Sequence, residues 1–138
     1  MTERKRPVLV WVISIFYVVS AAFTALSFYL VYSGSIPLQP QQAQYFDALT
    51  TFDWFSTLLI GVINFSAALL LFLMRKQAAY LFPSGFALGL AVTIWHTLTK
   101  GWLAALGDAG LVGAMIGWGI SIAVCVYCWR LLQRGALA

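Results

Sequence analysis

Few side chains in this sequence could carry chemistry, and the ionisable ones lie at the ends of apolar runs. His96, the only histidine, precedes Lys100 by about one helical turn, and Asp53 and Asp108 each stand at the start of another apolar run. Ionisable groups at the edge of a membrane bundle can relay protons, bind an anion or a metal, or latch helices together. One histidine with two aspartates is a sparse ligand set, so we predict no metal site.

The same residues also have a purely structural interpretation. Lys100 would form an ion pair with Asp53 or Asp108 at the membrane boundary, and His96 would bond to Thr93 or to a backbone carbonyl. The sequence favours this interpretation over a functional site, and it keeps the functional one open.

A second polar group, the Asn64 amide, lies in the middle of an uncharged run. Hydrocarbon offers an amide no hydrogen-bond partner, so Asn64 must find one inside the protein. Together with hydroxyls of the first apolar segment it would either line a solute path at mid-membrane or join helices to each other. The second role is the more common one for such an amide.

No pattern in the chain indicates catalysis or a cofactor. The sequence has no Ser-His-Asp order, no glycine-rich phosphate loop and no pair of haem ligands. His96 is the only credible acid or base, and no second catalytic group is fixed beside it, so we predict no catalytic residue, no cofactor and no enzyme. Cys125 and Cys128 fit small packing residues, with lipidation as a lesser alternative.

The composition requires a membrane environment for this chain. Of 138 residues 62% are hydrophobic and only 9% are charged, and the mean hydropathy is +0.91. These values predict a single integral membrane domain. The net charge of +4 does not indicate nucleic-acid binding, because the basic residues stand beside apolar runs rather than on a soluble face.

Apolar runs long enough to cross a bilayer predict an all-α bundle of four transmembrane helices, at about 7–32, 54–74, 77–99 and 109–129. The intervening segment 33–53 is the outer connection. Within it, 41–53 carries Tyr45, Phe46, Leu49 and Phe52 at helical spacing, which predicts a short helix lying in the headgroup region. Residues 101–107 are expected to form a short connection between the last two crossings.

The threading follows from the positions of the basic residues. Short connections rich in Lys and Arg stay in the cytoplasm, and only Lys100 falls on the other side. We therefore predict a multi-pass protein of the cell inner membrane with both termini cytoplasmic. The residues that set this orientation are Arg4, Lys5, Arg6, Arg75, Lys76, Arg130 and Arg134.

Small residues at every third or fourth position define a face on each of the last two predicted crossings. Such spacing lets helix backbones approach closely. We expect the two faces to pack against each other within one chain or across a dimer. They consist of Gly85 and Gly89 on the third crossing, and of Gly110, Gly113, Gly117 and Ser121 on the fourth.

Because packing features are the best organised part of the sequence, it favours a protein that acts by association. Such a chain would be an accessory or assembly subunit, or a homo-oligomer, with lipid and another membrane protein as its partners. The alternative is a small-solute or ion transporter or channel with an outer site at Asp53, His96 and Lys100 and a mid-membrane Asn64.

Overall fold

The computed structural model describes residues 7–137 and shows an all-helical chain in this range. The helices are α1 (Val8–Tyr32), α2 (Pro40–Asp47), α3 (Thr51–Phe72), α4 (Ala78–Lys100) and α5 (Trp102–Gln133). Among them α1, α3, α4 and α5 are long and apolar enough to cross a membrane. The prediction of an all-α protein with four such helices is confirmed.

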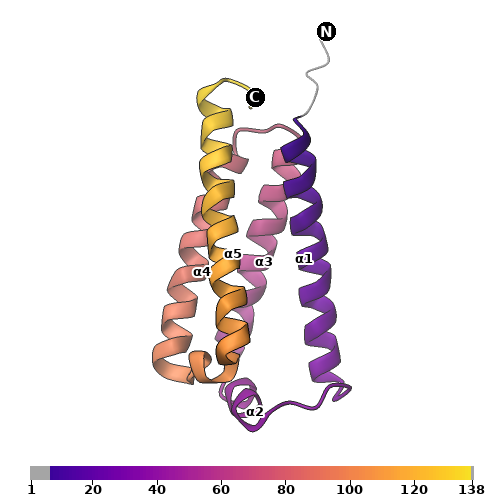
Figure 1. Cartoon of the computed structure of the whole chain (residues 1–138), viewed down its shortest axis with the longest axis vertical. Coiled ribbons are helices and arrows are strands. Elements are labelled where there is room, and N and C mark those ends of the chain that lie inside the picture. The colour runs from indigo at the N-terminus through magenta and orange to yellow at the C-terminus, as the bar shows by residue number, and fades with distance from the viewer. Residues whose placement is uncertain (1–6, 138) are drawn as a thin grey trace.

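The four long helices run up and down beside one another (Figure 1). Both described ends of the chain and the connection from α3 to α4 lie at one end of the bundle, which we call the terminal end. The short helix α2 and the turn from α4 to α5 lie at the opposite end, called the α2 end. Helix α3 packs against α1 and α4, and α5 packs against α4 and α2.

The segment expected to form one short helix over 41–53 is divided between two helices. Helix α2 ends at Asp47, and α3 begins at Thr51. The cause is a capping box, in which the Thr50 hydroxyl accepts the Asp53 N–H and the Asp53 carboxylate accepts the Thr50 N–H. Asp53 therefore belongs to the first turn of a long helix, which starts three residues before the predicted crossing at 54.

The expected connection over 101–107 is also largely helical. Gly101 adopts a left-handed conformation with φ 68° and ends α4, and Trp102 immediately starts the next helix. A break follows at Gly107, where φ is 67° and ψ is 177°. Glycine suits both positions because a side chain is strained at positive φ. The two glycines turn the chain back within one short helical segment.

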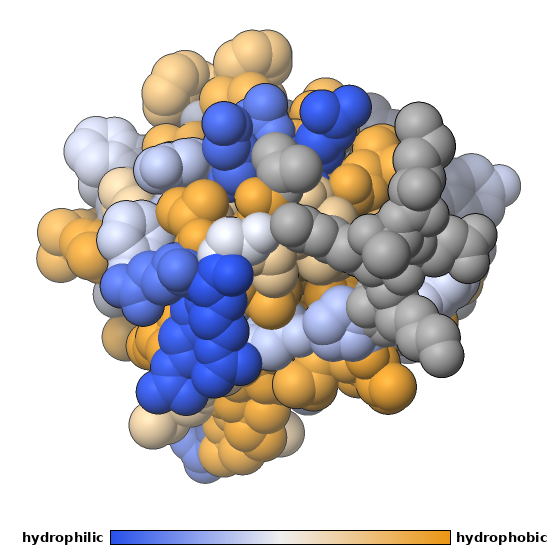
Figure 2. All heavy atoms as spheres, turned by 90° about the horizontal axis from the view of Figure 1, so that it is seen from above, coloured by the Kyte–Doolittle hydropathy of each residue, from blue (hydrophilic) through white to orange (hydrophobic). Residues whose placement is uncertain are grey.

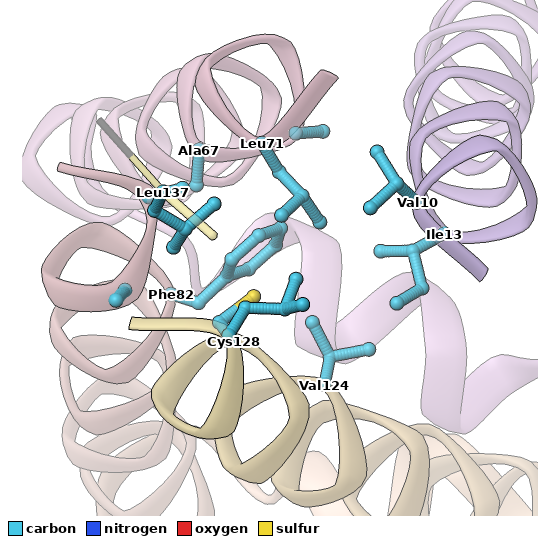
Figure 3. Close-up of a cluster of buried hydrophobic side chains, with 12 residues drawn as sticks. Val10, Ile13, Ala67, Leu71, Phe82, Val124, Cys128 and Leu137 are labelled. Carbon is cyan, nitrogen blue, oxygen red and sulfur yellow. The ribbon is translucent and has the colours of Figure 1, made fainter. Parts of the chain in front are cut away.

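The hydrophobic core lies at the terminal end of the bundle. Phe82 of α4 and Leu71 of α3 are among its largest fully buried side chains. Side chains from α1, α3, α4 and α5 and from the C-terminal segment meet there, as Figure 3 shows for Val10, Ile13, Ala67, Leu71, Phe82, Val124, Cys128 and Leu137. Because this packing is confined to one end, the α2 end is left free for a cavity.

Cys128 contributes to that core as a fully buried side chain, whereas Cys125 is only partly buried. A buried Ser14 hydroxyl also donates to the Ala68 carbonyl at 3.2 Å and joins α1 to α3. The predicted packing role of the cysteines agrees with these positions.

Viewed from the terminal end, hydrophilic residues form separate groups, with apolar residues between and outside them (Figure 2). The α3–α4 connection carries Arg75 and Lys76, and the end of α5 carries Arg130 and Arg134. The predicted basic residues 4–6 lie outside the described residues. The sides of the long helices instead expose many large apolar residues, for example Leu58 and Leu98, as expected for contact with lipid.

The two small-residue faces do not pack against each other within the chain, contrary to the expectation. A Cβ added to Gly85 would lie 2.6 Å from the Asn64 Oδ1 of α3, and one on Gly89 would lie 3.9 Å from the Ile60 Cγ2. The face on α4 is therefore turned toward α3, which follows from the short connection between these helices. On α5, Gly113 and Gly117 are exposed and have open space where a side chain would stand.

The remaining members of the α5 face make local contacts. A Cβ on Gly110 would meet the Leu106 side chain of the same helix. The Ser121 hydroxyl donates to the Gly117 carbonyl at 2.9 Å.

Candidate functional site

Three helices bring an ionic and aromatic cluster together at the α2 end. Asp53 stands in the first turn of α3, His96 and Lys100 in the last turns of α4, and Tyr45 in α2. The Asp53 Oδ1 lies 3.2 Å from the His96 Nε2, and the His96 Nδ1 lies 2.9 Å from the Tyr45 hydroxyl. Asp53 and His96 are only 3% and 5% exposed. We call these four residues the Tyr-His-Asp-Lys cluster.

The Asp53 carboxylate is the acceptor around which this cluster forms. Its Oδ2 accepts the Thr50 N–H and the Thr50 hydroxyl, both at 2.7 Å. The Lys100 Nζ lies 3.6 Å from the same oxygen. A carboxylate that receives several donors and a nearby ammonium is held in its charged form. Asp53 is thus an ionised acceptor for the His96 ring.

The tautomer of a neutral His96 ring follows from its two neighbours. An ionised carboxylate only accepts, so the Nε2 must carry the proton and donate to Asp53. In the neutral ring, the Nδ1 is then an acceptor and receives the Tyr45 hydroxyl proton. These assignments rest on bonding partners rather than on hydrogen positions. With a neutral His96, the order of donation is therefore Tyr45 to His96 to Asp53.

Tyr45 has the properties that this order requires. Partial burial raises the pKa of its hydroxyl, and the negative charge of Asp53 raises the pKa further. Tyr45 consequently keeps its proton at neutral pH and donates to His96. Its oxygen retains lone pairs that do not face the histidine, and these can accept a hydrogen bond from another molecule.

Lys100 connects this arrangement to the C-terminus of α2. Its ammonium donates to the Ala48 carbonyl at 2.7 Å, just past the last residue of that helix. A cation near a helix C-terminus is favourable, because unpaired carbonyls concentrate negative charge there. Lys100 and Asp53 compensate each other's charge, so with a neutral His96 the cluster carries no net charge.

A cavity of about 600 Å³ lies beside the cluster. Aromatic and aliphatic side chains form most of its wall, and its polar groups are uncharged when His96 is neutral. Every helix contributes to the wall. The lining residues include Phe28 and Val31 of α1, Ile36 and Leu38 of the following connection, Gln42, Tyr45 and Phe46 of α2, Trp54, Thr57 and Ile60 of α3, Gly89, Val92, Thr93 and His96 of α4, and Trp102, Ala105 and Leu106 of α5.

Cavities with apolar walls and a few oriented polar groups are the usual form of small-molecule sites. Asp53 and Lys100 do not belong to the lining. The wall therefore suits a neutral, mainly apolar molecule that carries a hydrogen-bonding group.

The structure brings together some of the predicted site residues and separates others. Asp53, His96 and Lys100 form one cluster, as their expected common level in the membrane suggested. Asp108 is exposed and has no ion pair with any residue in 7–137, so it stays outside. His96 bonds to side chains of α2 and α3 rather than to Thr93.

Thr93 also lines the cavity, about one turn before His96 on α4. Asn64 lines a second, smaller cavity. Within residues 7–137, the Asn64 side chain makes no hydrogen bond to the hydroxyls of the first helix, its predicted partners. It lies instead against Gly85 of α4. Among the described residues no three His, Cys, Asp or Glu side chains are placed to hold a metal ion.

Sequence reasoning missed Tyr45 and Thr50 as members of the site. Tyr45 was predicted only as part of an apolar helix face. The signal for Thr50 was present, because Thr followed three residues later by an acidic residue before an apolar run is a capping pattern. Nothing in the sequence indicated that the Tyr45 hydroxyl would meet a residue 51 positions later.

Comparisons of the chain with protein-family models, with curated proteins and with solved structures give no match. The function must therefore be inferred from the geometry of the Tyr-His-Asp-Lys cluster and its cavity.

Proposed function

We propose that this chain is a multi-pass membrane protein that binds a small, mainly apolar molecule carrying a hydrogen-bond donor. The observation that carries the proposal is the Tyr45–His96–Asp53 chain of hydrogen bonds, in which Tyr45 and His96 line the 600 Å³ cavity and Asp53 lies behind them. The order of donation leaves the Tyr45 oxygen as an acceptor for the bound molecule. The chain serves as the binding component of a transporter or receptor. The buried core closes the bundle at the terminal end, opposite the cavity.

We further propose that the terminal end faces the cytoplasm and the α2 end faces the outside of the cell inner membrane, with α2 in the headgroup region. The basic residues Arg75, Lys76, Arg130 and Arg134 support this orientation. In a background with Cys125 and Cys128 replaced by Ser, a membrane-impermeant maleimide should label Gln44→Cys in intact cells. Lys76→Cys should react only after the cells are opened. The reverse pattern would contradict the orientation.

Binding is tested with 2-naphthol, a largely apolar probe with one hydroxyl donor. In lipid nanodiscs, with empty nanodiscs as the blank, we expect saturable binding that weakens about five- to tenfold in Tyr45→Phe. This substitution keeps the ring and removes only the acceptor oxygen. Isothermal titration gives the affinities. Tyr80→Phe is the matched control, because Tyr80 is 57% exposed and lies on α4 near the terminal end.

A second probe separates the hydrogen bond from simple partition into the apolar cavity. 2-Methoxynaphthalene has the same rings but no donor, so its weaker binding should be equal in the original protein and in Tyr45→Phe. Equal affinity of 2-naphthol for both proteins would refute the proposed role of Tyr45. No saturable 2-naphthol binding above the blank would refute the function itself.

Association through α5 is a second candidate function, favoured by one specific observation. Gly113 and Gly117 are exposed and meet no atom within 4 Å of an added Cβ, so residues 7–137 leave this face uncovered. Small residues at this spacing suit close helix contact in a membrane. The face would join a second copy or another membrane protein.

The double substitution Gly113→Leu and Gly117→Leu tests this association. Because both positions are open, the larger side chains leave the monomer fold intact and obstruct only a partner helix. We expect the molar mass of the protein in mild detergent, measured by light scattering, to fall to that of the monomer. Gly119→Leu, also at an open position on α5, is the control. An unchanged mass in the double variant would rule the association out.

A further inference from the structure

A second, smaller cavity of about 160 Å³ adjoins the first one. The two cavities share three lining residues, Ile60 of α3 and Gly89 and Thr93 of α4. These three residues, which we call the waist, border both an outer chamber, beside His96, and an inner chamber, beside Asn64. The wall of the cavity at the α2 end therefore continues into the wall of a cavity that lies deeper in the bundle.

Two polar groups facing this space lack a hydrogen-bond partner among residues 7–137. Neither the Asn64 amide nor the Thr93 hydroxyl makes a hydrogen bond to any described residue, although both line the inner chamber. The neighbouring hydroxyls of Thr57 and Thr97, by contrast, donate to carbonyls of their own helices. A polar group in an apolar surrounding is costly without a partner. The chambers must supply that partner from a bound molecule or water.

The position of Asn64 depends on a glycine opposite it. Gly85 leaves room for the amide, since a Cβ there would stand 2.6 Å from the Asn64 Oδ1 and 3.0 Å from the Ile63 Cγ2. Along α4, Gly85 is at the level of Asn64 and His96 at the level of Tyr45. At about 1.5 Å per residue, these two levels are about 16 Å apart. This distance sets the length of a molecule that reaches both.

The inner chamber ends at the core. Phe82 forms part of its wall and is only 2% exposed. Figure 3 shows Phe82 among Leu71, Cys128 and other side chains of the core. The core therefore bounds the inner chamber on its terminal side, and Asn64 lies near the middle of α3.

We propose that the inner chamber is a second subsite for the same ligand, which is an elongated molecule with a hydrogen-bonding group at each end. One group donates to the Tyr45 oxygen, and the other, a hydroxyl, carbonyl or amide, bonds to the Asn64 amide. An apolar middle part passes the waist at Gly89. This inference rests on the proposed binding function and specifies the shape and the second polar group of the ligand.

The test compares three probes in lipid nanodiscs. 2-Naphthol reaches only the outer chamber, 4-octylphenol passes the waist without a terminal polar group, and 4-(8-hydroxyoctyl)phenol adds a hydroxyl at the far end. Asn64→Leu should weaken binding of the hydroxyoctyl probe about five- to tenfold, the loss expected when one hydrogen bond is removed. The affinities of 2-naphthol and 4-octylphenol should stay unchanged. Asn64→Ala gives the same comparison if the leucine variant does not fold.

Gly89→Leu is the second variant and obstructs the waist. A Cβ at this position is 3.9 Å from Ile60, an ordinary contact, so the substitution fills the passage without forcing the helices apart. Both long probes should lose at least tenfold in affinity, and 2-naphthol should lose less than either, because Gly89 borders the outer chamber as well as the waist. Gly61→Leu, where no atom lies within 4 Å of an added Cβ, is the control.

The outcomes separate the two proposals. Unchanged binding of the hydroxyoctyl probe in either Asn64→Leu or Gly89→Leu overturns the inner subsite while 2-naphthol still reports the outer site. Failure of 2-naphthol to bind the original protein overturns the proposed function.

Discussion

Replacing Asp53 by Ala is expected to lower the free energy of unfolding by about 3–5 kcal/mol, the usual cost of removing one partner from a buried ion pair. The substitution leaves the His96 Nε2–H and both Thr50 donors without their acceptor, and it removes the charge that faces Lys100. Each orphaned donor carries its own desolvation penalty. The loss should appear as a shift in the unfolding midpoint during titration with sodium dodecyl sulfate, followed by helical circular dichroism.

Asp108→Ala is the matched control for this prediction. Asp108 also stands near the start of a crossing, but it is exposed and has no ion pair within residues 7–137. Its removal should change the free energy of unfolding by less than about 0.5 kcal/mol. If the two variants unfolded alike, the buried carboxylate would not organise the α2 end as described.

Asp53→Ala should also abolish selective binding of 2-naphthol. Without the carboxylate, neither the ring orientation of His96 nor the direction of the Tyr45 hydroxyl bond is fixed. The probe would then bind no better than 2-methoxynaphthalene.

Phe82→Ala is expected to lower the free energy of unfolding by about 3 kcal/mol. Phe82 lies in the core at the terminal end, opposite the Tyr-His-Asp-Lys cluster. Phe82 is 2% exposed, and its ring lies 5.0 Å from that of Tyr17, measured between centroids. Lipid is as apolar as the core, so the cost arises from the lost contacts and the cavity that remains rather than from transfer out of water. The same detergent titration measures the change.

Phe55→Ala is the control for this core position, because Phe55 is 61% exposed on α3 and lipid can fill the space that its ring leaves. Its unfolding free energy should change by less than about 1 kcal/mol. Phe82→Ala should also keep its affinity for 2-naphthol, which occupies the outer chamber alone. A loss of 2-naphthol binding in Phe82→Ala would show that core and site are not separate parts of the bundle.

The effects expected for Asp53→Ala and Phe82→Ala arise at opposite ends of the bundle, which differ in structure. The terminal end holds the apolar core, and the α2 end holds the Tyr-His-Asp-Lys cluster and the outer chamber. A bundle packed throughout would leave no room for a ligand, and one without the core would have little to hold its helices in place. The proposed binding function uses the hollow end, while the proposed association uses the outer surface of α5, so the two can coexist.

The sequence by itself determined the number of long apolar helices, because this depends on local composition and run length, and the same features predict a membrane setting. It also brought Asp53, His96 and Lys100 to a common level, since each stands near a predicted helix end on the same side. The ends of α2 and α3 were less well predicted. The prediction of one helix over 41–53 relied on the aromatic spacing and did not use the capping pattern at Thr50. That cap decides where α3 begins and the backbone changes direction.

Only the tertiary structure decided which polar groups meet. The Tyr45 hydroxyl reaches His96, Asp108 stays outside the cluster, and Gly85 faces Asn64 rather than α5. These contacts depend on which helices are neighbours and on how each is rotated about its axis. In a bilayer several rotations bury equally apolar faces, so hydropathy does not select among them. The choice is made by close packing and by hydrogen bonds between helices, and these exist only once the helices are assembled.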